Sequence, residues 1–404
     1  RAVAIGWTGW RDVGMATRGS IEAVFESAGI ETLSVEEGVE IFVGEALAGG
    51  KRRVIGCGSL GLMDRFDSFR EAPMKLPAGM AASIADPRRF PLIDKLLTLD
   101  EGKSLISQCT LSTQHHLFLV DHAIEGVPYH PGVMALEMFA ENALLLLPGY
   151  CLAGFEEVSF GLPVKVMKGT MGVRVEASLE RSDGNLRWVT CRLVSDLVNS
   201  KGDIFGEPRL HHEAKVRLVA SGDDLCPFLQ NEVDALPAIG TPADGELIHH
   251  SSFIYLRYFH GPRFQSHGGV LRGIENGIDG IALMRHQLPA TDQFTSESDG
   301  EEVLLDALPM LIEAGFQNAG LAAMESDGFS SLPIGIEWST MLRVPEVDEK
   351  LRMRSVKVAT EDAGVTVHDV VIVGDDDAPV IALKGLRLKA MGEVPEDQRF
   401  TLER

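Results

Sequence analysis

A short segment of the chain, residues 121–132, combines a titratable side chain with glycines and the start of a helix. His122 is followed by Gly126 four residues later, and Pro131 and Gly132 come five and six residues after that glycine. The apolar run 133–139 follows directly and has helical spacing. Histidine is a base near neutral pH, glycine lets a backbone N–H approach a ligand, and a helix N-terminus favours negative charge. The segment therefore predicts a proton-transfer site with its own oxyanion donor.

A second group of candidate residues lies on a later helix. Pro309 opens an apolar helical run on which Glu313 and Gln317, four residues apart, share one face. A carboxyl group buried there would have a raised pKa and could act as a general acid. Asp306 is a rival acid, although Pro309 would break a helix that continued from it. Glu137 is a third, and its simplest interpretation is a solvated or capping carboxylate.

Composition restricts the class of protein. The chain has 404 residues, which suggests two to three domain-sized units, and its 45% hydrophobic and 24% charged residues are typical of globular proteins. A net charge of −22 argues against nucleic acid or an anionic membrane as partner. No apolar run reaches the roughly 20 residues that span a bilayer. The start at Arg1 resembles neither a signal peptide nor an initiating methionine, so we expect a piece of a longer protein.

The five cysteines are scattered and form no C-x-x-C pair. This spacing predicts no metal site and no disulfide framework, and it favours reduced thiols in the cytoplasm.

Residues 1–64 are predicted to form a small α/β segment. The pattern indicates strands and helices at Ala2–Trp7, Gly19–Ala28, Val35–Leu47 and Arg52–Gly56. A piece of this size cannot bury both faces of a parallel sheet by itself.

The rest of the chain reads as one α+β plan that occurs twice. In residues 65–220 a helix from Gly132 to Leu147 stands among predicted strands at Gln108–Leu111, His115–Val120, Val158–Phe160, Gly172–Leu179, Leu186–Val194 and Glu213–Val219. Residues 221–252, rich in Pro, Asp and Gly, form the linker. Residues 253–395 repeat the order with a helix at Pro309–Ala323 and strands at Gly335–Val344, Leu351–Thr360, Val365–Val373 and Val380–Met391, before a tail at 396–404. A duplicated half, with each long helix wrapped by an antiparallel sheet, predicts a double hot-dog fold.

The segment around His122 resembles the H-x-x-x-G-x-x-x-x-P-G signature of hot-dog dehydratases. The closest resemblance is to the dehydratase domains of polyketide and polyunsaturated fatty acid synthases. The second-half helix resembles their H-P-x-L-L-D-A-x-x-Q pattern, with Pro309 and Gln317 in place and Glu313 at the family's Asp. Glu137 stands where free-standing hot-dog dehydratases keep their acid. In a double hot-dog, however, His122 should meet the acid of the second half.

Three more segments carry the resemblance, which extends over roughly residues 65–395. Residues 257–265 resemble the family's G-Y-x-Y-G-P-x-F segment, with Arg257 for its Gly and His260 for its second Tyr. Residues 332–336 resemble the L-P-x-x-I segment beside the substrate tunnel, and residues 383–388 the closing strand. Residues 4–16 resemble the C-terminal end of a ketoreductase domain whose nucleotide-binding part would lie upstream, so we expect no reductase activity. An unrelated α/β cap is the alternative.

The resemblance implies dehydration of a β-hydroxyacyl chain carried on the phosphopantetheine arm of an acyl carrier protein. His122 would be the base, Glu313 the acid and Gln317 its orienting partner. The implied substrate-binding residues are Gly126, Pro131, Gly132, Tyr258, Gly261, Pro262, Phe264, Leu332 and Pro333.

The chemistry needs no cofactor. The implied partners are the acyl carrier protein and other domains of the same synthase, and a homodimer stays open. The Glu for Asp exchange favours the polyunsaturated fatty acid or enediyne type of synthase. An inactive double hot-dog that docks partners or shapes products, and a hot-dog thioesterase, are the alternative functions.

Overall fold

The structure is a computed structural model that describes residues 4–7, 9–11, 13–14, 25, 30–48, 53–56, 76–85, 88–167, 169–197, 206–221, 241–284, 305–346, 348–361 and 364–402. The chain divides into two compact units, Arg1–Leu76 and Pro77–Arg404. The predicted boundary at residue 64 and the middle of the predicted linker fall outside the described residues. No helix of the described part is both long and apolar enough to cross a bilayer.

The first unit contains a parallel pair of strands and a helix. Strand β1 (Ala4–Trp7) pairs with β2 (Arg53–Gly56), and α2 spans Val35–Ala48. Ser34 starts the helix through a capping box, because its Oγ accepts from the Glu37 N–H while its own N–H donates to the Glu37 carboxylate. These elements agree with the sequence pattern. The predicted helix at Gly19–Ala28 lies outside the described residues except for Phe25.

The second unit is built on one antiparallel sheet, in which the described residues supply thirteen strands. The first half contributes β3 (Lys95–Asp100), β4 (Ser104–Ser112), β7 (Tyr150–Phe160), β8 (Thr170–Asp183), β9 (Leu186–Ser195) and β10 (Arg209–Ala220). The second contributes β11 (His249–His250), β12 (His267–Ile274), β13 (Gly277–Ala282), β14 (Phe329–Met341), β15 (Leu351–Glu361), β16 (Val365–Val373) and β17 (Pro379–Glu393).

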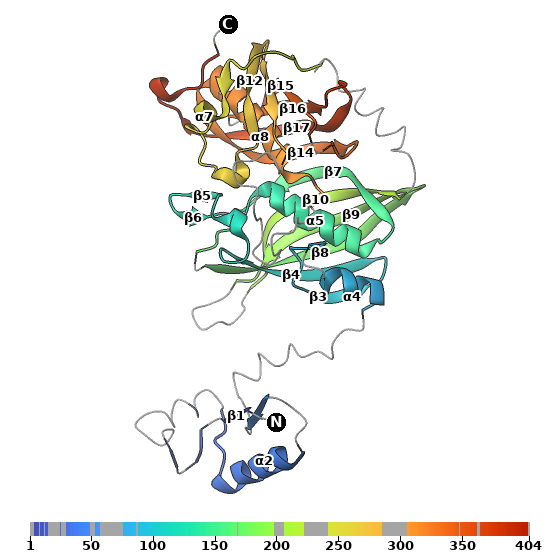
Figure 1. Cartoon of the computed structure of the whole chain (residues 1–404), viewed down its shortest axis with the longest axis vertical. Coiled ribbons are helices and arrows are strands. Elements are labelled where there is room, and N and C mark those ends of the chain that lie inside the picture. The colour runs from blue at the N-terminus through green and yellow to red at the C-terminus, as the bar shows by residue number, and fades with distance from the viewer. Residues whose placement is uncertain are drawn as a thin grey trace. The chain divides into compact units, whose positions relative to one another are not determined.

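The order of the strands shows the duplication. Outward from the centre, the first half runs β7-β10-β9-β8-β4-β3 and the second runs β14-β17-β16-β15-β13-β12, with β11 at the far edge. Helix α5 (Gly132–Leu146) precedes β7, and α8 (Pro309–Asp327) precedes β14. Each helix packs against the strands of its own half, and the two helices also contact each other (Figure 1). The predicted double hot-dog is confirmed.

Both long helices are buried almost all round, because the sheet curls about them. In α5 every residue from Val133 to Leu146 is buried, and in α8 every residue from Pro309 to Met324. Such helices carry little amphipathic contrast. Helix α8 ends at Gly328, whose left-handed φ of 74° suits a helix C-terminus.

Short elements fill the connections. They are α4 (Ala78–Ala85), η3 (Leu117–Leu119), β5 (Ala123–Ile124), β6 (Val127–Pro128), α7 (Ser251–Ile254), η4 (Pro262–Phe264) and η7 (Glu396–Gln398). The predicted strand at His115–Val120 is wrong. The backbone turns after Ser112, where the His116 N–H donates to the Ser112 carbonyl at 2.7 Å, and η3 then buries Phe118 and Leu119.

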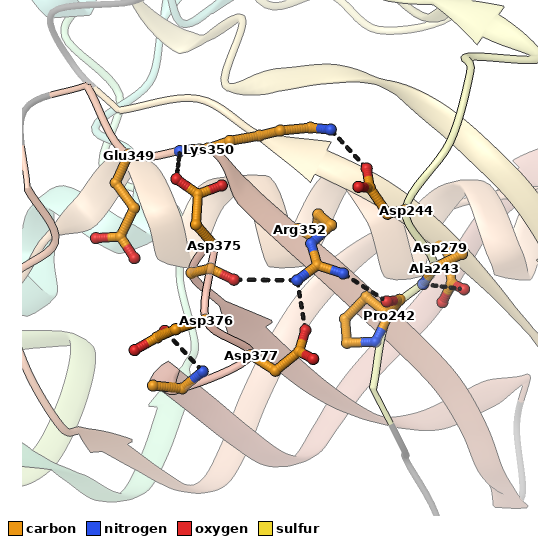
Figure 2. Close-up of polar contacts among 12 residues, drawn as sticks. Pro242, Ala243, Asp244, Asp279, Glu349, Lys350, Arg352, Asp375, Asp376 and Asp377 are labelled. Atoms are coloured by element: carbon orange, nitrogen blue, oxygen red, sulfur yellow. Dashed lines mark hydrogen bonds and ion pairs between the residues drawn. The ribbon is translucent and has the colours of Figure 1, made fainter.

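The segment that leads into the second half is hydrogen-bonded to residues of β13 and β15. The Ala243 N–H donates to Asp279 at 2.9 Å, and Arg352 donates to the Pro242 carbonyl at 3.1 Å (Figure 2). Residues 241–252, which composition assigns to the linker, therefore include ordered chain and β11. Cys109, Cys151 and Cys191 are free thiols, and the other two cysteines lie outside the described residues.

The two halves join where β7 pairs antiparallel with β14, with Gly154 opposite Thr340. Arg217 of β10 is fully buried behind this junction and donates to the Ser339 carbonyl at 3.2 Å and to Thr340 Oγ1 at 2.6 Å. Gly154 has a φ of 146°, and a Cβ there would clash with the Ser339 carbonyl. The junction therefore requires glycine at this position.

We expect Gly154→Ala to destabilise the second unit by about 1–3 kcal/mol or more, because the new methyl group would push β14 away. Chemical denaturation followed by circular dichroism measures the change. Gly172→Ala in β8 is the matched control, since a Cβ there meets nothing within 4 Å. Equal stability of the two variants would show that the junction tolerates a side chain.

Candidate active site

His122 lies between η3 and β5, and the backbone fixes its ring. Its Nδ1 lies 2.9 Å from the Tyr129 carbonyl, and the Tyr129 N–H donates to the His122 carbonyl at 2.9 Å. A carbonyl only accepts, so Nδ1 carries the proton and Nε2 keeps its lone pair. Burial first, and then the nearby His260 ring, lower the pKa of His122 to about 4, although Glu313 and the Tyr129 carbonyl act in the opposite direction. The ring is therefore neutral at physiological pH and suited to accept a proton.

The segment that follows His122 leads into α5 as predicted. Pro131 is the N-cap residue of the helix, and Gly132 is its first residue. A Cβ on Gly132 would lie 2.9 Å from the Phe160 ring, so the close packing requires glycine. Gly126 occupies the exposed turn between β5 and β6 with a φ of 78°, which accounts for glycine there through backbone conformation.

The loop that carries His122 is joined to a loop of the second half. The Gly261 N–H donates to the Asp121 carbonyl at 2.8 Å, and the Asp121 carboxylate accepts from the Arg263 backbone N–H at 3.1 Å and from its guanidinium at 2.8 Å. A Cβ on Gly261 would lie 2.5 Å from Asp121 Oδ1. Pro262 starts η4 immediately afterwards. These contacts bring the predicted residues of the two halves together.

The rings of the second-half loop cover His122. Phe264 is fully buried, and its ring centroid lies 5.4 Å from that of His122. Phe259 lies 5.0 Å from His122 on another side, and His260 lies 5.6 Å away. His122 therefore sits in a largely aromatic environment.

Glu313 of α8 reaches the same place through His260. The Glu313 Oε1 atom lies 3.1 Å from His260 Nε2 and accepts from Gln317 Nε2 at 3.0 Å. Gln317 also donates to the Phe264 carbonyl at 2.8 Å. The predicted pair, Glu313 and Gln317, thus shares one helix face as expected, and it meets the loop that covers His122.

Two tyrosines of the second half hold Gln317. The Tyr255 hydroxyl donates to Gln317 Oε1 at 2.6 Å, and the Tyr258 hydroxyl donates to the Gln317 carbonyl at 2.6 Å. Burial first, and then the charge of Glu313, raises the pKa of Tyr258, so its hydroxyl stays a donor. Gly320 on the next turn of α8 leaves room for Tyr258, since a Cβ there would lie 2.6 Å from the hydroxyl.

The expected raised pKa at Glu313 is wrong. Burial by itself raises the pKa of this carboxyl, but the hydrogen bond with His260, the electrostatic effect of that neighbouring imidazole and the Gln317 hydrogen bond lower it below its usual value. Glu313 is therefore an ionised carboxylate at neutral pH.

The two rival acids lie elsewhere. Glu137 is fully buried, and its two oxygens accept from the backbone N–H groups of Asp306 and Ala307 at 2.8 and 2.7 Å. Burial and the neighbouring Asp306 raise the pKa of Glu137 to about 8. Asp306 is paired with Arg89. Glu137 thus holds the backbone just before α8 and caps neither helix, and because it is fully buried the solvated alternative is wrong.

Two predicted residues stand apart from this network. Leu332 and Pro333 lie on β14 opposite Lys389 and Leu388 of β17, and Leu332 is 37% exposed. Sequence reasoning did not identify Asp121, Arg263 and Tyr255. The signals were present, because Asp121 precedes His122, Arg263 fills the variable position after Gly-Pro, and Tyr255 stands one helical turn before Tyr258.

Comparison with known proteins supports the fold of the second unit. Residues 90–193 match the family model of the polyketide synthase dehydratase domain. A search of the curated proteins found no match. The structure resembles the dehydratase domain from the CurF module of curacin polyketide synthase (15% identity, TM-score 0.54), over 75% of this chain and 99% of that one.

Two further solved structures are similar. One is a trans-AT polyketide synthase dehydratase domain from Brevibacillus brevis, with 17% identity, a TM-score of 0.54 and coverage of 75% of this chain and 99% of that chain. The other is the dehydratase domain of a mycocerosic acid synthase-like polyketide synthase, with 16% identity, a TM-score of 0.51 and coverage of 75% and 97%. The likeness of residues 4–16 to a ketoreductase stays a prediction. The unit from Pro77 onward is thus a double hot-dog of the polyketide synthase dehydratase type, and residues 90–193 carry the sequence pattern of that domain family.

Proposed function

We propose that this chain removes water from a β-hydroxyacyl thioester carried on an acyl carrier protein and forms the α,β-unsaturated thioester. One observation carries the proposal. A neutral histidine of the first half, His122, meets the Glu313–Gln317 pair of the second half at a loop contributed by residues 257–264.

In this proposal His122 is the base. Its Nε2 lone pair takes the proton from the carbon next to the thioester carbonyl, while the Tyr129 carbonyl holds the ring by Nδ1. The N-terminus of α5 at Gly132 follows on the same segment, and the partial positive charge of a helix N-terminus would favour the negative charge that develops on the carbonyl oxygen.

Side chains of the second half complete the proposed reaction. The bond between the β-carbon and the hydroxyl oxygen breaks as that oxygen receives a proton, and water leaves. The proton comes from the hydrogen-bonded group of Glu313, Gln317 and His260 in the second half. Gln317 fixes the carboxylate through a hydrogen bond at 3.0 Å and is itself held by Tyr255 and Tyr258. The proposed scheme includes no cofactor, because a base and a proton donor are sufficient for this chemistry.

The aromatic cover suits an acyl substrate. Phe264 is fully buried beside His122. Phe259 also contacts the His122 ring, and 37% of Phe259 is exposed. In this proposal the aromatic rings would keep water away from the thioester, which would strengthen the polar contacts at the reacting carbon. The other domains of the same synthase would supply the carrier-bound chain.

His122→Phe should reduce dehydration of a β-hydroxyacyl thioester by about 10²–10⁴-fold, because a general base is lost. A phenyl ring preserves the contacts with Phe259 and Phe264, so the fold should stay intact by circular dichroism. Formation of the unsaturated thioester is followed by ultraviolet absorbance. Near wild-type turnover in this variant excludes His122 as the base, and release of free thiol by the wild type would indicate a thioesterase instead.

Glu313→Gln should lose most of the rate with little change in Tm, because the shape and the His260 contact are kept while the charge is removed. Glu137→Gln is the matched control. Its amide would point an N–H₂ group at a backbone N–H, which costs about 1–3 kcal/mol of stability. The rate of the folded fraction should change little. The assignment of the two carboxyl groups is reversed if Glu137→Gln is the inactive but stable variant.

The pH dependence of kcat/KM should reflect the lowered pKa of His122. A base must be unprotonated, and the pKa of His122 is lowered from 6.5 to about 4. The rate should therefore stay level as pH falls through 6.5 and should decline only as it approaches 4. Circular dichroism at each pH separates this decline from acid unfolding. A break near 6.5 would mean that the ring is solvated in the working enzyme.

A further inference from the structure

His260 occupies the position of the second tyrosine in the family's G-Y-x-Y-G-P-x-F segment, and it lies between the base and the carboxylate. Its Nε2 lies 3.1 Å from Glu313 Oε1, and both side chains are only 8% exposed. Its ring stacks on Phe259 with centroids 4.3 Å apart and planes 21° apart. The ring is therefore held between Glu313 and Phe259, and its centroid lies 5.6 Å from that of His122.

The other ring nitrogen of His260, Nδ1, makes no hydrogen bond within the described residues. This Nδ1 atom is also buried. A buried polar atom of this kind normally has a partner, so an unpaired one at a candidate active site suggests a partner that arrives with the substrate. A substrate hydroxyl is such a partner, because it both donates and accepts.

Glu313 is poorly suited to carry the transferable proton. It accepts from Gln317 and faces His260, and the net effect of its surroundings is to lower the pKa of its carboxyl group. An ionised carboxylate can stabilise a cation, but it has no proton to donate.

We propose that His260, paired as an imidazolium with the Glu313 carboxylate, donates the proton to the leaving hydroxyl through Nδ1, and that Glu313 is a positioning residue. This proposal rests on the dehydratase function proposed above. It makes the site a pair of histidines with opposite roles, in which His122 accepts a proton and His260 gives one.

The protons balance over one turnover. His122 Nε2 gains the proton of the broken C–H bond, and His260 Nδ1 loses one to the hydroxyl oxygen as the C–O bond breaks. Water and the unsaturated thioester leave. His122 is then protonated and His260 neutral, and transfer of one proton from the first ring to the second, or exchange with solvent, restores the starting state.

The groups around His260 are consistent with His260 as the proton donor and His122 as the proton acceptor. Glu313 of α8 supplies the negative charge, and His122 faces the ring from the first half at 5.6 Å. Tyr258 lies 5.6 Å from His260 on its own loop, and its raised pKa keeps it uncharged. Asp121 neighbours both loops but is paired with Arg263. A positive charge on His260 also favours a neutral His122, since it lowers the pKa of that ring.

The test compares His260→Phe with Glu313→Gln, using the same 404-residue chain and a β-hydroxyacyl thioester of N-acetylcysteamine. If His260 is the donor, His260→Phe loses about 10²–10⁴-fold in kcat and is the more impaired variant. The double variant is then no slower than His260→Phe alone, because the two residues act as one unit. His260→Gln should fail in the same way, while His115→Gln, at an exposed histidine, should keep wild-type turnover.

The opposite assignment gives the opposite order. If Glu313 were the donor, removal of the His260 ring would take away a contact that keeps the carboxyl ionised. His260→Phe would then stay active and Glu313→Gln would be inactive. An impairment of Glu313→Gln equal to or greater than that of His260→Phe overturns the proposal.

A second measurement does not depend on turnover or on a variant that folds. Carbon-13 NMR of the Glu313 carboxyl group in the wild-type protein should show a carboxylate at neutral pH, and a protonated carboxyl there overturns the proposal. Failure of the proposed function looks different, because the wild type itself would then leave the β-hydroxyacyl thioester unchanged.

Discussion

The pairing of β7 with β14 is the interaction on which the rest of the second unit depends. It turns two separate antiparallel sheets into one, and it sets the two long helices against each other. This pairing is supported by a buried polar group in addition to its backbone hydrogen bonds. Arg217 of β10 donates to the Ser339 carbonyl and to the Thr340 side chain, both on β14. A buried guanidinium must be satisfied by such partners, so it favours one register over a slipped one.

That register matters because neither half holds all the residues of the proposed proton-transfer site. The proposed base comes from a loop before α5, and the carboxylate comes from α8. The Asp121 contacts with Gly261 and Arg263 hold the two loops together at the place where α5 and α8 approach. Two of these three residues contribute through backbone N–H groups. The close approach therefore depends on main-chain geometry and on the missing side chain of Gly261, and less on the chemical type of its neighbours.

The periodicity of the sequence was sufficient to predict α5, α8 and most strands, since these elements have strong apolar patterns and clear stops at Pro148 and Gly328. It failed at His115–Val120, where a β-like composition folds as a turn and η3 because Ser112 begins a backbone-bonded turn. The candidate base followed from local spacing. The ionisation of Glu313 did not, because it depends on His260, which lies 53 residues away in the chain and contacts Glu313 only after folding.

The two helices show how the same spacing acquires opposite chemistry. Each carries a polar pair four residues apart, Glu137 with Glu141 on α5 and Glu313 with Gln317 on α8. On α5 the glutamates accept from backbone N–H groups near a further acid, and burial raises the pKa of Glu137. On α8 a neighbouring imidazole lowers the pKa of Glu313 in spite of burial. The surroundings of each pair therefore decide its charge, because burial beside another acid favours the protonated form of Glu137 and a neighbouring imidazole favours the ionised form of Glu313.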